Sequence, residues 1–194
     1  NGAKIYVSLQ GFPIKLANGQ IGIYALYKDI TERKKREKQI EFLSFHDEMT
    51  ALYNRRYFEN ELKRLESSRK YPITIVIGDL DGLKIVNDNY GHKMGDDYII
   101  KAADILKSTA RTEDIIARIG GDEFAIILPN TNYKEAKRFC QRIQNNFVEF
   151  NKDEKTVKPL SISLGFEVME DSTQSLNRIF NKADQNMYLN KGRK

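Results

Sequence analysis

The chain has 194 residues, of which 40% are hydrophobic and 30% charged, which fits one soluble domain of ordinary size plus a short additional segment. The formal net charge is +5, but residues 41–190 hold 21 basic and 24 acidic groups, so the basic excess lies at the two ends. This distribution argues against a binding surface for a nucleic acid polymer. No apolar run reaches the roughly 18 residues of a membrane helix, and no signal peptide opens the sequence.

The single cysteine, Cys140, excludes an internal disulfide and favours a cytoplasmic location. It lies among apolar residues at helical spacing, so we interpret it as a buried hydrophobe rather than a nucleophile. No Cys/His cluster has the spacing of zinc ligands. Because the sequence begins at Asn1, we expect a fragment of a longer protein, which leaves open a membrane anchor upstream.

Residues 3–9 and 21–27 read as two short strands, with Asn18-Gly19 as a turn signal between them. Two strands cannot form a stable core, so we expect them to be the end of a larger unit. A charged helix is predicted over 30–45. Its apolar positions do not sustain a heptad seam, so both a coiled-coil coupling helix and a plain solvated linker remain open.

From His46 onward the pattern is that of a mixed domain in the order βαββαβ with flanking helices. This order predicts the α+β, ferredoxin-like class, with an antiparallel sheet covered by helices. The predicted strands are 73–80, 114–119, 123–128 and 160–168, and the predicted helices are 54–68, 95–110, 132–150 and 175–190. Gly120-Gly121 marks the hairpin between the second and third strands.

Two acidic clusters could carry chemistry. One lies at the end of the predicted strand 73–80, and the other lies at the start of the predicted strand 123–128. Asp79-Leu80-Asp81 ends the buried strand, where a carboxylate needs a partner such as Mg²⁺. Asp122-Glu123 follows the paired glycines, which allow close approach of a ligand. Read alone, each cluster favours an ordinary polar turn. If the two strands are neighbours, the carboxylates converge into a metal-dependent phosphoryl or nucleotidyl transfer site.

A third cluster, Asn87, His92 and Asp96, offers donors and acceptors for a nucleobase. A carboxylate fits the paired N1–H and N2–H₂ donors of guanine, and adenine lacks that pair. Asp96 therefore favours guanine, while a structural turn is the alternative interpretation for His92.

Four ordered segments carry a resemblance to a known family. They are DEMTALYNRRYF (47–58), DLDGLKIVND (79–88), ARIGGDEF (117–124) and ADQNMYLNK (183–191). Together they resemble the GGDEF family of diguanylate cyclases, whose catalytic domain has a palm-type sheet. The segment GFPIKLANGQIGIYALYKDITERKK resembles the last hairpin and exit of a PAS sensor domain. The resemblances imply three parts: a PAS fragment (1–29), a helical signalling linker (30–45) and a GGDEF domain (46–194).

The family resemblance implies roles for particular residues. Asp79 and Asp122 would hold Mg²⁺, with Mn²⁺ as an alternative, helped by the backbone carbonyl of Leu80. Either Asp122 or Glu123 would deprotonate the ribose 3′-hydroxyl. The implied substrate contacts are Lys84 and Lys191 at the phosphates, Asn87 and Asp96 at guanine with His92 near them, and the backbone of Gly120 and Gly121.

The implied reaction joins two GTP molecules into cyclic di-GMP and releases two pyrophosphates. Each domain would hold one GTP, so a homodimer is required. Arg111 and Asp114 have the RxxD spacing of the family's inhibitory product site, and Arg142 matches a further arginine there. A surface salt bridge is the alternative interpretation.

The sequence also departs from the family pattern at its end. Lys191-Gly192-Arg193 is contracted, which argues against a phosphate role for Arg193. Three other functions are alternatives for this sequence: a GGDEF domain that binds GTP or cyclic di-GMP without turnover, a cyclase with a mixed GMP–AMP product, and a template-dependent polymerase. The intact acids disfavour the first, Asp96 disfavours the second, and the absence of a basic channel disfavours the third.

Overall fold

The structure is a computed structural model that describes residues 4–66, 71–153 and 157–192; Arg193 lies outside this part. The chain divides into two compact units, Asn1–Ser44 and Phe45–Lys194, which are taken in turn. No helix in the described part of the chain is long and apolar enough to cross a membrane.

The first unit is a hairpin followed by a helix. Strand β1 (Val7–Lys15) pairs antiparallel with β2 (Ile21–Asp29), and α1 (Thr31–Phe45) follows. The predicted turn is present, with Gly19 at a φ of 82°. The first strand, predicted over 3–9, begins at Val7 and continues through Gly11 and Pro13 to Lys15; residue 3 lies outside the described part. A two-stranded ribbon has only edge strands, and edge strands tolerate proline.

Both faces of this hairpin carry exposed apolar side chains. Ile21 and Ile23 are each 79% exposed, and Tyr27 is 70% exposed. Isolated hairpins of this kind are marginally stable in water. The exposure is that expected of strands that normally pack against something else.

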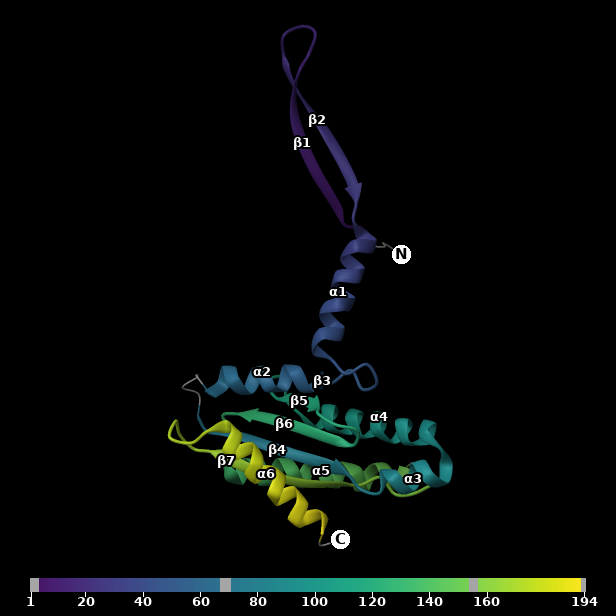
Figure 1. The fold of residues 1–194 in the computed structure, drawn as a ribbon, viewed down its shortest axis with the longest axis vertical. Helices are drawn as coiled ribbons and strands as arrows, with labels where there is room; N and C mark the ends of the chain where they lie inside the picture. Colours follow the sequence, from purple (N-terminus) through teal and green to yellow (C-terminus); the bar gives the residue numbers. More distant parts are fainter. Residues whose placement is uncertain (1–3, 67–70, 154–156, 193–194) are drawn as a thin grey trace. The chain divides into compact units, whose positions relative to one another are not determined.

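The second unit contains the mixed sheet and its helices (Figure 1). Its strands lie in the order β3-β5-β6-β4-β7, and all neighbours are antiparallel except β3 with β5. Apart from the two-residue β3, this is the ferredoxin-like order, so the predicted fold class is confirmed. The strands are β3 (Tyr53–Asn54), β4 (Ile73–Leu80), β5 (Ile115–Arg118), β6 (Glu123–Pro129) and β7 (Ile162–Met169).

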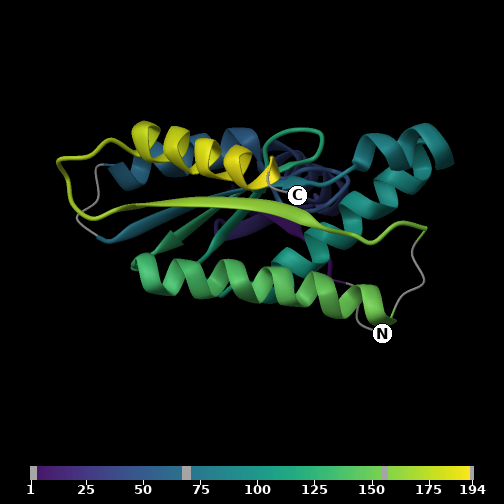
Figure 2. The ribbon, with the colours of Figure 1, turned by 90° about the horizontal axis from the view of Figure 1, so that it is seen from below.

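Helices cover both faces of the sheet, and Figure 2 shows α5 and α6 on opposite sides of it. Alternate residues of β4 supply the two cores: Ile75 and Ile77 face α2 and α6, whereas Val76 and Leu80 face α4 and α5. β4 is buried along its whole length, as its unbroken apolar run predicted. The helices of this unit are α2 (Arg55–Glu66), α3 (Leu83–Tyr90), α4 (His92–Thr109), α5 (Tyr133–Asp153) and α6 (Leu176–Lys191).

The predicted helix over 95–110 is corrected by the structure. It begins earlier, at His92, as α4, and a separate helix, α3, precedes it. Gly91, at a φ of 84°, separates the two helices. A Cβ on Gly165 of β7 would lie 2.0 Å from the backbone nitrogen of Met187, so this glycine lets α6 rest directly on the sheet. Cys140 is a free, buried thiol in the core of α5, as predicted.

Candidate active site

The two predicted acidic clusters meet at one end of the central strands. Asp79, near the end of β4, is paired in register with Glu123, the first residue of β6. The backbone N–H of Leu80 donates to the carbonyl of Asp122 at 3.0 Å. Cross-strand partners project to the same face of a sheet, so the Asp79 and Glu123 side chains both face α6. The structure therefore brings together carboxylates that are 44 positions apart in the sequence.

Asp79 is the most enclosed acid of this group, with 7% of its surface exposed. The Lys191 ammonium, from the last turn of α6, lies 2.5 Å from its carboxylate. Burial raises the pKa of Asp79, and the negative charges of Asp122 and Asp81 raise it further, against the opposing effect of Lys191. The hydrogen bond to Asp79 in turn raises the pKa of Lys191. Asp79 thus occupies a position where a cation would be stabilised.

Asp81, two residues further on, is held by a different strand. Its carboxylate accepts hydrogen bonds from the hydroxyls of Ser161 at 2.8 Å and Ser163 at 2.6 Å. Its backbone N–H donates to the carbonyl of Ser161. Asp81 therefore connects the loop after β4 to the start of β7, whereas Asp79 faces the cleft described next.

A cleft opens beside Asp79 and Glu123, and successive turns of α6 form its other wall. Besides the two acids and Lys191, its walls are Asp184, Gln185, Met187, Tyr188 and Leu189. Sequence reasoning missed Asp184 and Tyr188. Their spacing to Lys191, seven and three residues, is that of one helix face and could have identified them.

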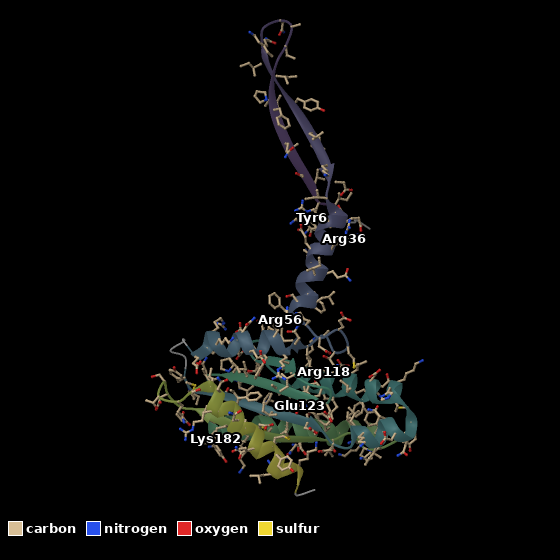
Figure 3. All side chains as sticks on the ribbon, in the orientation of Figure 1. Tyr6, Arg36, Arg56, Arg118, Glu123 and Lys182 are labelled. Carbon is tan, nitrogen blue, oxygen red and sulfur yellow. The ribbon has the colours of Figure 1, made fainter. Side chains whose placement is uncertain are left out.

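Arg118 holds the turn that carries the paired glycines, and Figure 3 labels it together with Glu123. Its guanidinium donates to the carbonyls of Gly120 at 3.2 Å and Gly121 at 2.8 Å. A Cβ on Gly120 would lie 2.3 Å from a carboxylate oxygen of Glu123, whereas nothing lies within 4 Å at Gly121. Gly120 is thus needed for the packing of Glu123, and Gly121 leaves open space beside the backbone.

The same guanidinium reaches the segment before β3. It pairs with the Asp47 carboxylate at 3.2 Å, and Asp47 also accepts from the N–H and hydroxyl of Thr50. Burial opposes ionisation of Asp47, but the Thr50 hydrogen bonds and Arg118 outweigh it and lower its pKa. Sequence reasoning missed this pair, because the two residues are distant in the chain and neither is unusual in its local pattern.

The predicted base-reading residues lie where α3 meets α4. A Cβ on Gly95 would lie 1.9 Å from Oδ1 of Asn87, so the Asn87 amide packs on the backbone just before Asp96. This Oδ1 is buried and has no hydrogen-bond partner among the described residues. Asp96 is half-buried, and His92 is exposed at the first position of α4. An unpartnered buried acceptor is costly, which marks Asn87 as a place for a ligand donor.

Lys84 is exposed on the first turn of α3, two residues after Gly82, which has a φ of 71°. No ion pair between Lys84 and an acid is present among the described residues. The structure therefore leaves a free lysine beside the loop that follows Asp79, as a phosphate contact would need.

The three residues of the predicted inhibitory site also gather in one place. The Asp114 carboxylate accepts from the backbone N–H of Arg111 at 2.8 Å. Arg142, on α5, donates to the carbonyl of Thr109 at 2.9 Å. Burial raises the pKa of Asp114, and both arginines act in the opposite direction through their charge. Arg142 therefore lies close enough to Asp114 for its positive charge to oppose the rise in the pKa of that carboxyl.

Comparison with known proteins identifies the family. Residues 44–194 match the family model described as "Diguanylate cyclase, GGDEF domain". The chain is 32% identical to the probable diguanylate cyclase DgcE of Escherichia coli over 184 residues, which are 92% of this chain and 17% of that protein. It is 29% identical to the diguanylate cyclase DgcM of Escherichia coli over 193 residues, 97% of this chain and 46% of that protein. The chain thus spans less than half the length of these two relatives.

Among solved structures, the coiled coil and GGDEF domain of DgcB from Caulobacter crescentus, in complex with c-di-GMP, superposes with a TM-score of 0.75. The match covers 84% of this chain and 88% of that one at 24% identity, so it supports the fold. The family match over most of the chain, the two relatives and the shared fold agree. The chain belongs to the GGDEF family of diguanylate cyclase domains.

Proposed function

We propose that this chain is a diguanylate cyclase that condenses two GTP molecules into cyclic di-GMP with release of two pyrophosphates. The observation that carries the proposal is the meeting of Asp79, Glu123 and Lys191 at one cleft, with the backbone of Asp122 bonded to Leu80 beside them. Acids that face a lysine beside an open cleft are the parts that metal-assisted nucleotidyl transfer requires.

The residues fit a divalent cation of the Mg²⁺ type, and Mn²⁺ shares the same oxygen ligands. Asp79 is buried with its pKa raised by burial and by neighbouring acids, so a cation would relieve its unfavourable charge. We assign the ion to Asp79, Asp122 and the carbonyl of Leu80. Within the described ranges no three acidic, histidine or cysteine side chains gather as a complete metal cage. Mg²⁺ normally completes such a two-carboxylate site with substrate phosphates and water.

We assign guanine recognition to Asn87 and Asp96. The buried, unpartnered Oδ1 of Asn87 can accept from the base, and the half-buried Asp96 carboxylate can accept from two donors. Adenine would leave these acceptors unpaired, which discriminates strongly against it. His92 is exposed at the first position of α4, where it can contact the nucleotide.

The chemical step forms one bond and breaks one bond on each GTP. The 3′-oxygen of one nucleotide attacks the α-phosphorus of the other, and the bond from that phosphorus to the pyrophosphate oxygen breaks. Asp122 or Glu123 accepts the 3′-hydroxyl proton, while Lys84 and Lys191 balance charge on the departing phosphates. The bound metal would polarise the phosphate oxygens. Each chain supplies one nucleotide, so turnover requires two copies.

Two further assignments concern control. We assign product inhibition to Arg111, Asp114 and Arg142, because arginine pairs bidentately with phosphate and a carboxylate accepts from guanine. We also assign residues 1–29 to the last hairpin of a PAS sensor, 30–45 to a signalling helix and 46–194 to the catalytic domain. The exposed apolar faces of β1 and β2 support the presence of neighbouring strands in a complete sensor.

The test is to incubate the chain with GTP and Mg²⁺ and to analyse the nucleotides by mass spectrometry. We expect cyclic di-GMP and pyrophosphate from the wild type, at least about 100-fold less from Asp122→Ala, and unchanged turnover from Asp104→Ala, an exposed acid on α4. Binding of GTP without product, at concentrations where dimers are shown by light scattering, would replace this proposal with a non-catalytic binding domain.

A further inference from the structure

The segment before β7 carries a lysine whose backbone is fixed against α4. The Tyr98 hydroxyl donates to the carbonyl of Lys158 at 2.6 Å and accepts from its backbone N–H at 3.0 Å. Tyr98 is 5% exposed, so its ring is a rigid support. Asn151 holds Leu160 in the same two-way manner, at 2.8 Å for each bond. Figure 2 shows this segment entering β7 beside α4.

The side chain of Lys158 occupies the space where residue 82 would carry its side chain. Gly82 is the residue before α3, at a φ of 71°. A Cβ built on it would lie 1.9 Å from Nζ of Lys158. The ammonium is therefore held against the loop that joins Asp79 to α3, and a larger residue at position 82 would displace it.

The charge of this ammonium is not matched by an acid in the part of the chain that the structure describes. Within the described residues Lys158 forms no ion pair, and the nearby Asp81 accepts hydrogen bonds from Ser161 and Ser163. Lys84 lies exposed on the first turn of α3. Lys158 is half-buried as a residue, and an anionic ligand beside its ammonium would supply a charge-assisted hydrogen bond.

We propose that Lys158 contacts the terminal phosphates of GTP, as a positioning group that lies outside the four family motifs. The inference rests on the proposed function, because it takes the loop at 81–84 as the phosphate-binding loop. Lys158 and Lys84 would hold the β- and γ-phosphates from two elements, α3 and the segment before β7. Negative charge grows on these groups as pyrophosphate departs, so the same contact would favour the forward step.

The first test compares nucleotides that differ only in their terminal phosphates. Binding of GTP and of GMP is measured by calorimetry with Mg²⁺ for the wild type and Lys158→Gln. We expect the Kd for GTP to rise about tenfold, the loss of one charge-assisted contact, and the Kd for GMP to change less than twofold. Lys137→Gln, an exposed lysine on α5, is the matched control and should change neither value.

A second variant reaches the same contact from the other side. Asparagine tolerates positive φ, so Gly82→Asn keeps the turn but fills the space of the ammonium. We expect it to weaken GTP binding by about the same factor as Lys158→Gln, and the double variant to be little weaker than either one. Lys158→Arg, which keeps the charge, should recover part of the affinity.

The outcomes separate this inference from the proposed function. Wild-type binding of GTP with an unchanged Kd in Lys158→Gln would overturn the role of Lys158 and leave the cyclase proposal intact. An equal loss for GTP and GMP would show a structural role and overturn it as well. If the wild type binds no GTP, both proposals fail together.

Discussion

The guanidinium of Arg118 lies 3.2 Å from the Asp47 carboxylate while it also donates to the carbonyls of Gly120 and Gly121. One side chain thus joins the segment at the start of the second unit to the turn that presents Asp122 and Glu123. Arg118 is 13% and Asp47 24% exposed, so the pair is shielded from solvent. A substitution at Asp47 should therefore alter the position of the turn that carries Asp122 and Glu123.

We expect Asp47→Asn to loosen this turn. The loss of a partly buried, hydrogen-bonded charge should lower the free energy of unfolding by about 1–3 kcal/mol and reduce cyclic di-GMP formation. Urea unfolding and a pyrophosphate release assay measure the two effects. Glu59→Gln breaks the exposed pair of Glu59 with Arg55 and should cost less than about 0.5 kcal/mol. Equal stabilities of the two variants would contradict the expected role of Asp47.

Asp79 should show the opposite relation between charge and stability. Its pKa in the folded chain is raised, chiefly by burial, so the folded state gains stability when this group is protonated. That gain is present below the unfolded pKa of about 3.9 and is lost as pH rises through the folded pKa. We therefore expect Asp79→Asn to unfold at no lower urea concentration than the wild type at pH 7, although its turnover falls at least about 100-fold.

The control for this prediction is Asp81→Asn. Both carboxylate oxygens of Asp81 accept a serine hydroxyl, and an asparagine offers one acceptor oxygen. This variant should lose about 1 kcal/mol of unfolding free energy. If Asp79→Asn proved the less stable of the two at pH 7, the burial cost of Asp79 would be smaller than the value of its pairing with Lys191.

We expect Arg111→Ala to relieve the proposed inhibition by cyclic di-GMP. The arginine side chain takes no part in the proposed chemistry, so initial turnover should be unchanged. The cyclic di-GMP concentration that halves the rate should rise at least tenfold, because a bidentate arginine–phosphate contact is lost. Arg138→Ala, one helical turn before Arg142 on α5 and exposed, should leave the inhibition constant as it is. Unaltered inhibition in Arg111→Ala would remove the product site from this position.

Gly95→Ala tests the placement of Asn87. The added Cβ would lie 1.9 Å from Oδ1 of Asn87 and push the amide from its position, while alanine suits the helix better than glycine by about 1 kcal/mol. We expect the KM for GTP to rise about tenfold without loss of stability. If the effect acts through Asn87, adding Gly95→Ala to Asn87→Ala should change KM little further. Full additivity would show that Gly95 acts on its own.

The main elements of the catalytic unit could be predicted because local patterns specify them. The unbroken apolar run of β4 predicted a buried strand, and the spacing of apolar residues predicted α5 and α6. What could not be predicted depends on contacts distant in sequence. β3 has only two residues and exists through its parallel pairing with β5, and no periodicity can reveal a strand of that length.

The candidate site shows the same division. The acids of the two motifs could be predicted from their positions at strand ends. The register that pairs β4 with β6 could not be predicted. The pairing of Asp79 with Glu123 and of Arg118 with Asp47 is set by tertiary packing. Lys158 lies in a segment without a motif, and its position follows from Tyr98 of α4 and from the missing side chain at Gly82.

The buried thiol of Cys140 has a practical consequence. Burial raises its pKa to about 12, and thiolates, not thiols, react with maleimides. A new cysteine at an exposed position such as Tyr188, 73% exposed at the cleft, would then be the preferred site for a fluorescent dye in the otherwise native chain. Energy transfer between donor- and acceptor-labelled copies would follow the approach of two cleft faces in real time, with no need to remove the natural cysteine.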